Sequence, residues 1–222
     1  GSDVYDFEVF DDGSGPRLFA ATSSGVHAWN GSTWTSLPLP PGVVRALTVG
    51  DGDGPGPQPV SLFAGGEFDA AAIGLRHVAR WNGTTWVALG SGATAGVDGV
   101  VNDLQFFGSP GSPVPSLYVG GDFSSAGGQS ITDVARWDGF TWFSAGSFPN
   151  FGSGRRVTSF ATHLGSLYAA LDASAGTARG LYTWNAGSWI QVLQLGSPIL
   201  ALASFDPDGT GAAPADLYMG LL

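Results

Sequence analysis

Short apolar runs recur along the chain, and turn residues separate them. Five such runs lie at 4–10, 43–49, 100–107, 157–162 and 199–205. After each comes a second run that begins with Leu and an aromatic residue, at Leu18, Leu62, Leu117, Leu167 and Leu217. Runs of this length between turn residues are typical of β-strands. No amphipathic stretch of helical length interrupts them, so the pattern predicts an all-β protein.

The eight Trp residues fall into four pairs, and the two members of each pair are five positions apart. The pairs are Trp29 and Trp34, Trp81 and Trp86, Trp137 and Trp142, and Trp184 and Trp189. Three pairs enclose an Asn-Gly or Asp-Gly dipeptide, which supplies positive φ angles for a tight turn. We therefore expect each pair to bracket a β-hairpin, with one Trp ending a strand and the other opening the next.

Each repeat thus contains four short strands, called a to d here. Four strands in a repeat of about 50 residues are typical of a β-propeller blade. We expect antiparallel four-stranded blades at 4–38, 43–91, 100–147 and 157–195, and a half-blade at 199–222. A single blade is not stable alone, because both of its faces must be buried against neighbours. Residues 1–222 are expected to form one propeller domain or half of a propeller.

The half-blade raises the question of how the ring closes. Two chains sharing one ring would supply about nine blades, just beyond the usual range of roughly four to eight. One chain closing on itself would give five blades, with small residues such as Gly65-Gly66 and Gly120-Gly121 permitting the tighter packing. We favour the first arrangement, a homodimer that closes the ring by self-association.

The third repeat carries the most specific sequence motif. It reads Leu-Tyr-Val-Gly-Gly-Asp-Phe-Ser-Ser-Ala-Gly-Gly at 117–128 and Val-Ala-Arg-Trp-Asp-Gly-Phe-Thr-Trp at 134–142. This sequence resembles the kelch-like repeats of large bacterial secreted or surface proteins, and it is similar to repeats in fungal cortical cell-polarity markers. The resemblance implies a propeller in an extracytoplasmic setting. It implies no particular ligand, because one fold hosts many functions.

Composition and charge exclude several classes of function. With 36 Gly and 14 Pro the chain is rich in turn-formers, but 43% hydrophobic residues are enough for a large core. The absence of Cys and Lys excludes disulfides, thiol nucleophiles and Schiff-base chemistry. A net charge of −10 argues against nucleic acid as a partner. No apolar run approaches the roughly 18 residues of a membrane span, and no motif calls for a cofactor.

The connections between strands b and c are the first candidate site. In propellers of this kind these loops share a face with the d–a connections, where ligands usually bind. The second and third repeats have long b–c loops that contain Glu67, Asp69, Arg76, His77, Asp122 and Asp133. Carboxylates, Arg and His around a channel mouth are suited to a sugar or a cation. The simpler interpretation, which we favour, is that these loops are polar because they are solvated.

An acid and an Arg also occur together in these two repeats. Glu67 accompanies Arg80, and Asp122 accompanies Arg136. Because strands b and c are antiparallel neighbours, we expect the two members of each set to form an ion pair across the ladder. The preceding double glycine would leave room for the Arg or its neighbouring Trp. We interpret the pairs as structural, with a binding site as the alternative.

Asp-Gly sequences mark three of the a–b connections, at 11–13, 51–54 and 206–209. Alternating Asp and Gly resembles part of a calcium-binding loop, but the later bidentate acid is missing. Asp-Gly is also common in hairpin turns, and we favour that interpretation. No metal site is therefore predicted.

These observations favour a non-catalytic structural or interaction module of a secreted or surface repeat protein. The alternative is a carbohydrate-binding propeller that uses the b–c loop face, with a glycan in place of a protein as its ligand. A third hypothesis is a glycoside hydrolase, which needs two carboxylates across a site, such as Glu67 and Asp122. The segment Asp138 to Trp142 is similar to the Asp box of sialidase propellers, but its register differs, and that box is structural.

Overall fold

The computed structural model describes residues 1–38, 42–54, 56, 59–108, 114–149, 154–174, 178–209 and 214–222. Backbone contacts divide the chain into two compact units, Gly1–Ser144 and Ala145–Leu222. Within this part of the chain the secondary structure is strand, apart from two single-turn 3₁₀ helices. The prediction of an all-β chain with four-stranded antiparallel sheets is confirmed.

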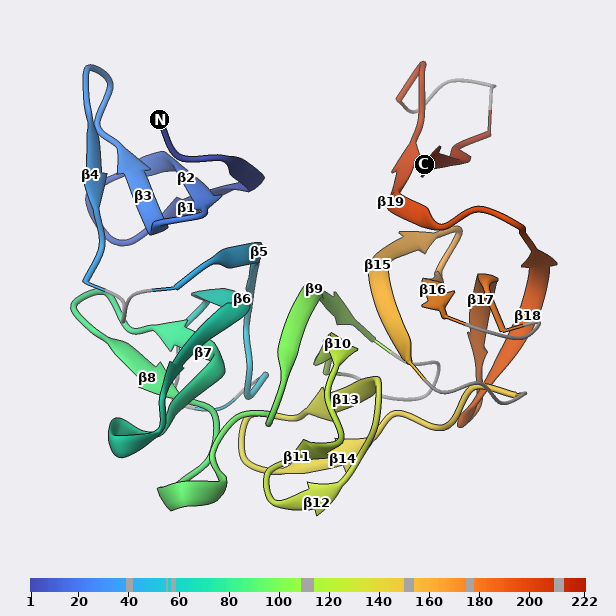
Figure 1. The fold of residues 1–222 in the computed structure, drawn as a ribbon. Helices are drawn as coiled ribbons and strands as arrows, with labels where there is room; N and C mark the ends of the chain where they lie inside the picture. Colours follow the sequence, from blue (N-terminus) through green and yellow to red (C-terminus); the bar gives the residue numbers. More distant parts are fainter. Residues whose placement is uncertain are drawn as a thin grey trace. The chain divides into compact units, whose positions relative to one another are not determined.

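Three four-stranded antiparallel sheets make up the first unit, and they follow one another along the chain (Figure 1). The first contains β1 (Val4–Asp11), β2 (Pro16–Thr22), β3 (Gly25–Trp29) and β4 (Trp34–Ser36). The second contains β5 (Val44–Gly50), β6 (Ser61–Ala70), β7 (Leu75–Trp81) and β8 (Trp86–Ala88), with helix η1 (Ala71–Ile73) between β6 and β7. The third contains β9 (Val100–Phe107), β10 (Ser116–Asp122), β13 (Val134–Trp137) and β14 (Trp142–Ser144). Two shorter features complete the unit: helix η2 (Gly92–Thr94) and a hairpin of β11 (Ser125–Ala126) and β12 (Gln129–Ser130).

The second unit contains one four-stranded antiparallel sheet and one two-stranded sheet (Figure 1). The four-stranded sheet is formed by β15 (Arg155–His163), β16 (Ser166–Ala173), β17 (Gly180–Asn185) and β18 (Ser188–Gln194). The two-stranded sheet is formed by β19 (Ile199–Phe205) and β20 (Asp216–Leu221). Among the described residues, no helix has the length and apolar character needed to cross a bilayer.

The two members of each Trp pair stand opposite each other across a hairpin, as the sequence predicts. The two indole rings lie 5.2 to 5.4 Å apart in all four hairpins. The turn chemistry differs from the prediction, because in the first three hairpins Gly alone has a positive φ. The Asn30 side-chain oxygen instead accepts hydrogen bonds from the backbone N–H groups of Ser32 and Thr33, and Asn82 and Asp138 act in the same way. These side chains stabilise the turn by bonding their own backbone.

A β-bulge occurs at the same place in the first strand of the four four-stranded sheets and of the β19–β20 sheet. One residue of strand a has no partner in strand b, and these residues are Tyr5, Arg45, Asn102, Thr158 and Leu200. A bulge bends the strand and increases its twist. The double glycine of strand b belongs to this feature, because a Cβ on Gly66 or Gly121 would overlap a carbonyl oxygen beside the bulge. The expectation that these glycines make room for an Arg or Trp is wrong.

Within each unit, two apolar side chains of strand a join a sheet to the one before it. We call them the leading pair; one precedes the bulge and the other follows three positions later. In four of the five sheets the pair is buried: Val44 with Leu47, Val101 with Leu104, Val157 with Phe160, and Ile199 with Leu202. Within the first unit, Val101 and Leu104 pack in one cluster with Ala46, Phe63 and Val78 of the preceding sheet. The core therefore lies between the sheets.

Polar contacts accompany these apolar joints. The backbone N–H of Leu47 donates to the Asp6 carboxylate of the preceding sheet at 2.8 Å, and that of Leu202 donates to Ser159 Oγ at 3.0 Å. The indole N–H of Trp142 likewise reaches back to the carbonyl of Leu89 at 3.0 Å. Burial raises the pKa of Asp6, although hydrogen bonds from Leu47 and Phe7 act to lower it.

We predict that Asp6→Ala destabilises the protein by about 1–3 kcal/mol, because the Leu47 N–H loses its acceptor inside a joint. Asp6→Ser, which copies Ser159, should restore most of this loss. Urea unfolding of the three proteins measures both effects. Equal stabilities for the Ala and Ser variants would show that the hydrogen bond contributes nothing.

The same pair predicts a pH dependence. Because folding raises the pKa of Asp6, the folded protein binds that proton more tightly than the unfolded chain. The stability of the wild type relative to Asp6→Ser should therefore be greatest in acid and fall as pH rises through the raised pKa. A constant difference between the two proteins across this range would contradict the burial argument.

We also predict that Trp142→Phe costs about 1 kcal/mol more than Trp86→Phe. Both changes remove the same ring volume, but only Trp142 loses a hydrogen bond, since the buried Trp86 Nε1 has no partner among the described residues. Thermal or urea unfolding compares the two variants directly. Equal losses for the two variants would mean that the hydrogen bond to the Leu89 carbonyl is energetically neutral.

Candidate functional site

The predicted b–c loop of the second sheet is largely an extension of strand. β6 continues to Ala70, and Asp69 and Arg76 stand opposite each other in its ladder with β7. Phe68 alternates with the exposed Glu67 and Asp69 and is fully buried in the core. The buried Phe extends the period-2 pattern beyond the double glycine, which explains why this segment is strand where a loop was expected.

Glu67 pairs with a residue that the sequence analysis did not single out. Its carboxylate accepts from Arg45 Nε at 3.0 Å, and Arg45 is the bulged residue of β5. The expected pair with Arg80 is wrong. Arg80 stands opposite Phe63, four positions from Glu67, and donates instead to Ser61 Oγ at 3.4 Å. Both partners of the Arg45–Glu67 pair are exposed, so solvent screens it.

His77 lies in β7 and contacts polar groups of β6. Its Nε2 lies 3.9 Å from Asp69 Oδ2, and its Nδ1 lies 3.3 Å from the Gly66 carbonyl oxygen. Burial lowers the pKa of His77, outweighing Asp69 and Asp98, which act to raise it. The imidazole is therefore neutral at neutral pH, and the contact with Asp69 is not an ion pair. Arg76 points elsewhere and donates from Nη1 to the Ala93 carbonyl at 3.2 Å.

Asp98 completes this neighbourhood and was missed by sequence reasoning. Its carboxylate accepts from the backbone and hydroxyl of Ser124 and from the N–H of Ser125, at 2.7 to 2.8 Å. Burial acts to raise the pKa of Asp98, but these hydrogen bonds outweigh it and lower the pKa. Asp98 thus remains ionised, and its hydrogen bonds connect the segment before β9 to the segment after β10.

The third sheet holds its predicted residues differently. Asp122 is exposed at the end of β10, and Asp133 is buried just before β13. The expected pair of Asp122 with Arg136 is wrong, because Arg136 stands opposite Tyr118 and its guanidinium lies 4.8 Å above the Phe143 ring. Arg136 is therefore a cation–π partner within its own hairpin.

A positive φ recurs near the start of strand c. In all four complete sheets a positive φ occurs at the residue just before Val26, Val78, Val134 or Leu181, and these residues are Gly25, His77, Asp133 and Gly180. Two sheets use glycine, which adopts this conformation without strain. His77 at +59° and Asp133 at +65° keep side chains there at an energetic cost. Both belong to the predicted b–c site, so the strain coincides with the candidate residues.

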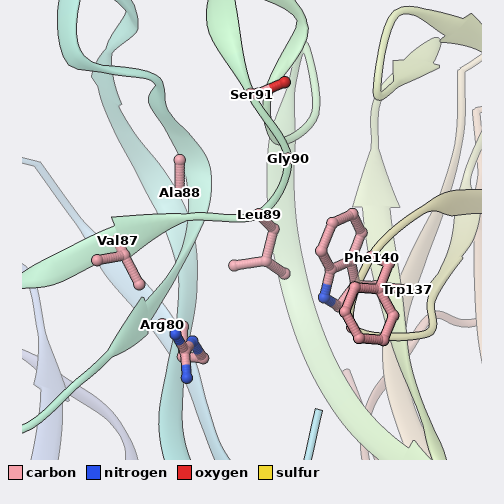
Figure 2. A pocket seen from close by; sticks show the side chains of 9 residues that line it. Arg80, Val87, Ala88, Leu89, Gly90, Ser91, Trp137 and Phe140 are labelled. Carbon is pink, nitrogen blue, oxygen red and sulfur yellow. The ribbon is translucent and has the colours of Figure 1, made fainter. Parts of the chain in front are cut away.

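A hollow of about 340 Å³ opens between the second sheet and the β13–β14 hairpin (Figure 2). Trp137 and Phe140 come from the hairpin, Val87, Ala88 and Leu89 come from β8 and the residue after it, and Arg80 comes from β7. Burial lowers the pKa of Arg80, with Asp53 acting to raise it. Phe140 is 66% exposed, although the other hairpins carry Ser32, Thr84 and Gly187 at this position. The described residues that line the hollow offer one cation and an aromatic wall, and none of them is an acid.

The Asp-Gly connections show turn chemistry. Asp11 accepts from the N–H groups of Gly13 and Gly15, and Asp206 accepts from the N–H of Asp208. In the part of the chain that the structure describes, no group of three or more His, Cys, Asp or Glu side chains could hold a metal ion. The carboxylates are thus used within their own loops.

Comparisons with known proteins add no assignment. No protein-family model matches the chain, and no curated protein matches it.

We predict that His77→Val destabilises the protein by about 1–3 kcal/mol more than His77→Gly, because a β-branched residue is strained at this φ. Both variants lose the imidazole and its contacts, so the difference isolates backbone strain. Urea unfolding measures it. Equal losses would show that the segment adopts another conformation in solution.

Proposed function

We propose that this chain is a non-catalytic interaction module, built from propeller-type blades of a secreted or surface repeat protein. Support for the blade interpretation comes from four antiparallel sheets with one repeated bulge, one repeated Trp hairpin and buried leading pairs. The kelch-like motif at 117–142 supports the extracytoplasmic setting. The blades act by packing against other protein.

The observation that carries the proposal is an apolar surface on the first sheet. Val4 and Phe7 form the leading pair of β1, and they are 50% and 52% exposed. The corresponding residues of the other four sheets are at most 8% exposed. Val9 and Trp34 extend the surface, and the Phe7 and Trp34 rings lie 6.4 Å apart. A contiguous apolar surface of this kind marks a protein-binding site.

Carbohydrate binding is the second candidate, and one observation favours it. Among the described residues, His77 and Asp133 are the polar ones with a positive φ, and both belong to the b–c segments that contain the predicted site residues. Strain of this kind is concentrated at functional sites. A glycoside hydrolase ranks lower, because Glu67 is engaged by Arg45.

We predict that the wild-type protein associates in solution and that Phe7→Asp reduces its mass to the 22.6 kDa of one chain. A charge placed in the apolar β1 surface disfavours its burial against a partner. Light scattering on a sizing column measures the mass, and Val9→Asp serves as a second variant.

Phe140→Asp is the matched control, since Phe140 is an exposed Phe in the β13–β14 hairpin, away from β1. It should leave the mass unchanged. A wild type that remains at one chain mass at every concentration would contradict the interaction function.

A further inference from the structure

The two-stranded sheet carries a surface that matches the receiving side of a complete sheet. In the second sheet, the side that receives the next leading pair includes Ala46, Phe63 and Gly65. A Cβ on Gly65 would overlap Val101 and crowd Leu104. The leading pair therefore occupies the space that a side chain at Gly65 would fill. By strand register, the equivalents in β19 and β20 are Ala201, Tyr218 and Gly220. We call these three residues, with Ala203 and Phe205, the β19–β20 face.

The position at Gly220 is open. A Cβ built there would meet only Ala201 of its own sheet, at 3.7 Å or more. Tyr218 is 50% exposed and Phe205 is 58% exposed. The glycine that receives a leading pair is therefore present in the β19–β20 face, while the pair of Val4 and Phe7 is exposed on β1. A second copy of this chain carries both halves of such a joint, so it can supply the occupant of each surface.

Residue volumes at the two surfaces compensate each other. In the joint between the second and third sheets, Phe106 fills the space beside Gly50, where a Cβ would overlap its ring. At the equivalent positions, the β19–β20 face has Phe205 in place of Gly50, and β1 has Val9 in place of Phe106. Gly50 beside Phe106 and Phe205 beside Val9 each combine a larger side chain with a smaller one, so the total volume packed in the joint is similar.

Backbone hydrogen bonding is also compatible. In the joint that uses Ala46, the preceding sheet offers no acceptor, and the N–H of Leu104 donates to its own Asp103 at 2.7 Å. The β19–β20 face likewise has Ala201 at this position, and the N–H of Phe7 donates to its own Asp6 at 2.8 Å. Packing β1 against the β19–β20 face would therefore not leave the Phe7 N–H without an acceptor.

We propose that the β19–β20 face of one copy packs against β1 of a second copy, with Val4 and Phe7 entering the space at Gly220. The partner of the open β1 surface is thus another molecule of this chain, joined head to tail through a copy of the internal joint. This inference rests on the proposed interaction function. Because the two surfaces differ, the contact is heterologous, and it closes into a ring or continues as an array.

Complementation of two variants tests the proposal. Gly220→Leu fills the receiving position, and the backbone and surroundings of Gly220 accept a side chain without strain. Phe7→Asp disables the other surface. Each variant alone should have the mass of one chain, whereas their equimolar mixture should form a complex of twice 22.6 kDa, since one intact joint remains. Gly196→Leu is the matched control, because Gly196 has open space around it and should leave wild-type association unchanged.

A chemical readout covers the case of weak association. Because the sequence has no Cys, Val4→Cys and Gly220→Cys chains can be mixed with a short bifunctional maleimide. The proposal requires a cross-linked dimer that contains one of each chain, at least tenfold above the yield with Phe140→Cys in place of Val4→Cys.

The outcomes separate the two proposals. If Gly220→Leu retains wild-type mass while Phe7→Asp does not, then the β1 surface binds something other than the β19–β20 face. The head-to-tail joint would then be wrong, and the interaction function would stand. A wild type that remains monomeric without heterologous cross-linking would overturn both.

Discussion

The burial of two strand-a side chains in the preceding sheet is the contact on which this architecture depends. A four-stranded antiparallel sheet with both faces in water keeps little apolar surface from solvent, and short strands such as β4 and β8 add few ladder bonds. Removing Val44 and Leu47, or Val101 and Leu104, from water is what holds consecutive sheets together. The bulge between the two members of each pair sets the twist that aims both at the same neighbour. Local hairpins and inter-sheet joints therefore stabilise each other.

Much of this fold could be predicted from sequence because its signals are local. Trp137 and Trp142 enclose Asp-Gly, and Leu117 begins an apolar run, so strand positions follow from neighbours in the chain. The bulge could not be predicted, since nothing in the residue type distinguishes Tyr5, Arg45 or Leu200 as unpaired. It arises from register, which depends on how whole strands align.

The candidate site was only partly predictable for a related reason. Residue types drew attention to His77 and Asp133, but their backbone strain has no sequence signal, because the same position holds Gly25 in another sheet. The expected ion pairs joined strands b and c, but Glu67 of β6 pairs with Arg45 on β5, the other neighbour of its strand. A strand has two neighbours, and sequence spacing gave no means of choosing between them.

The bulged residue of strand a has a consequence of its own. It takes no part in the pairing of strands a and b, and the five sheets place Tyr, Arg, Asn, Thr and Leu there without altering the bulge. Arg45 reaches Glu67 from this position, and Thr158 donates to the Ile199 carbonyl at 2.6 Å. The side chain at the bulge can thus vary in chemistry while the backbone structure of the sheet stays the same. Each added repeat brings one more position at which surface chemistry can change in this way.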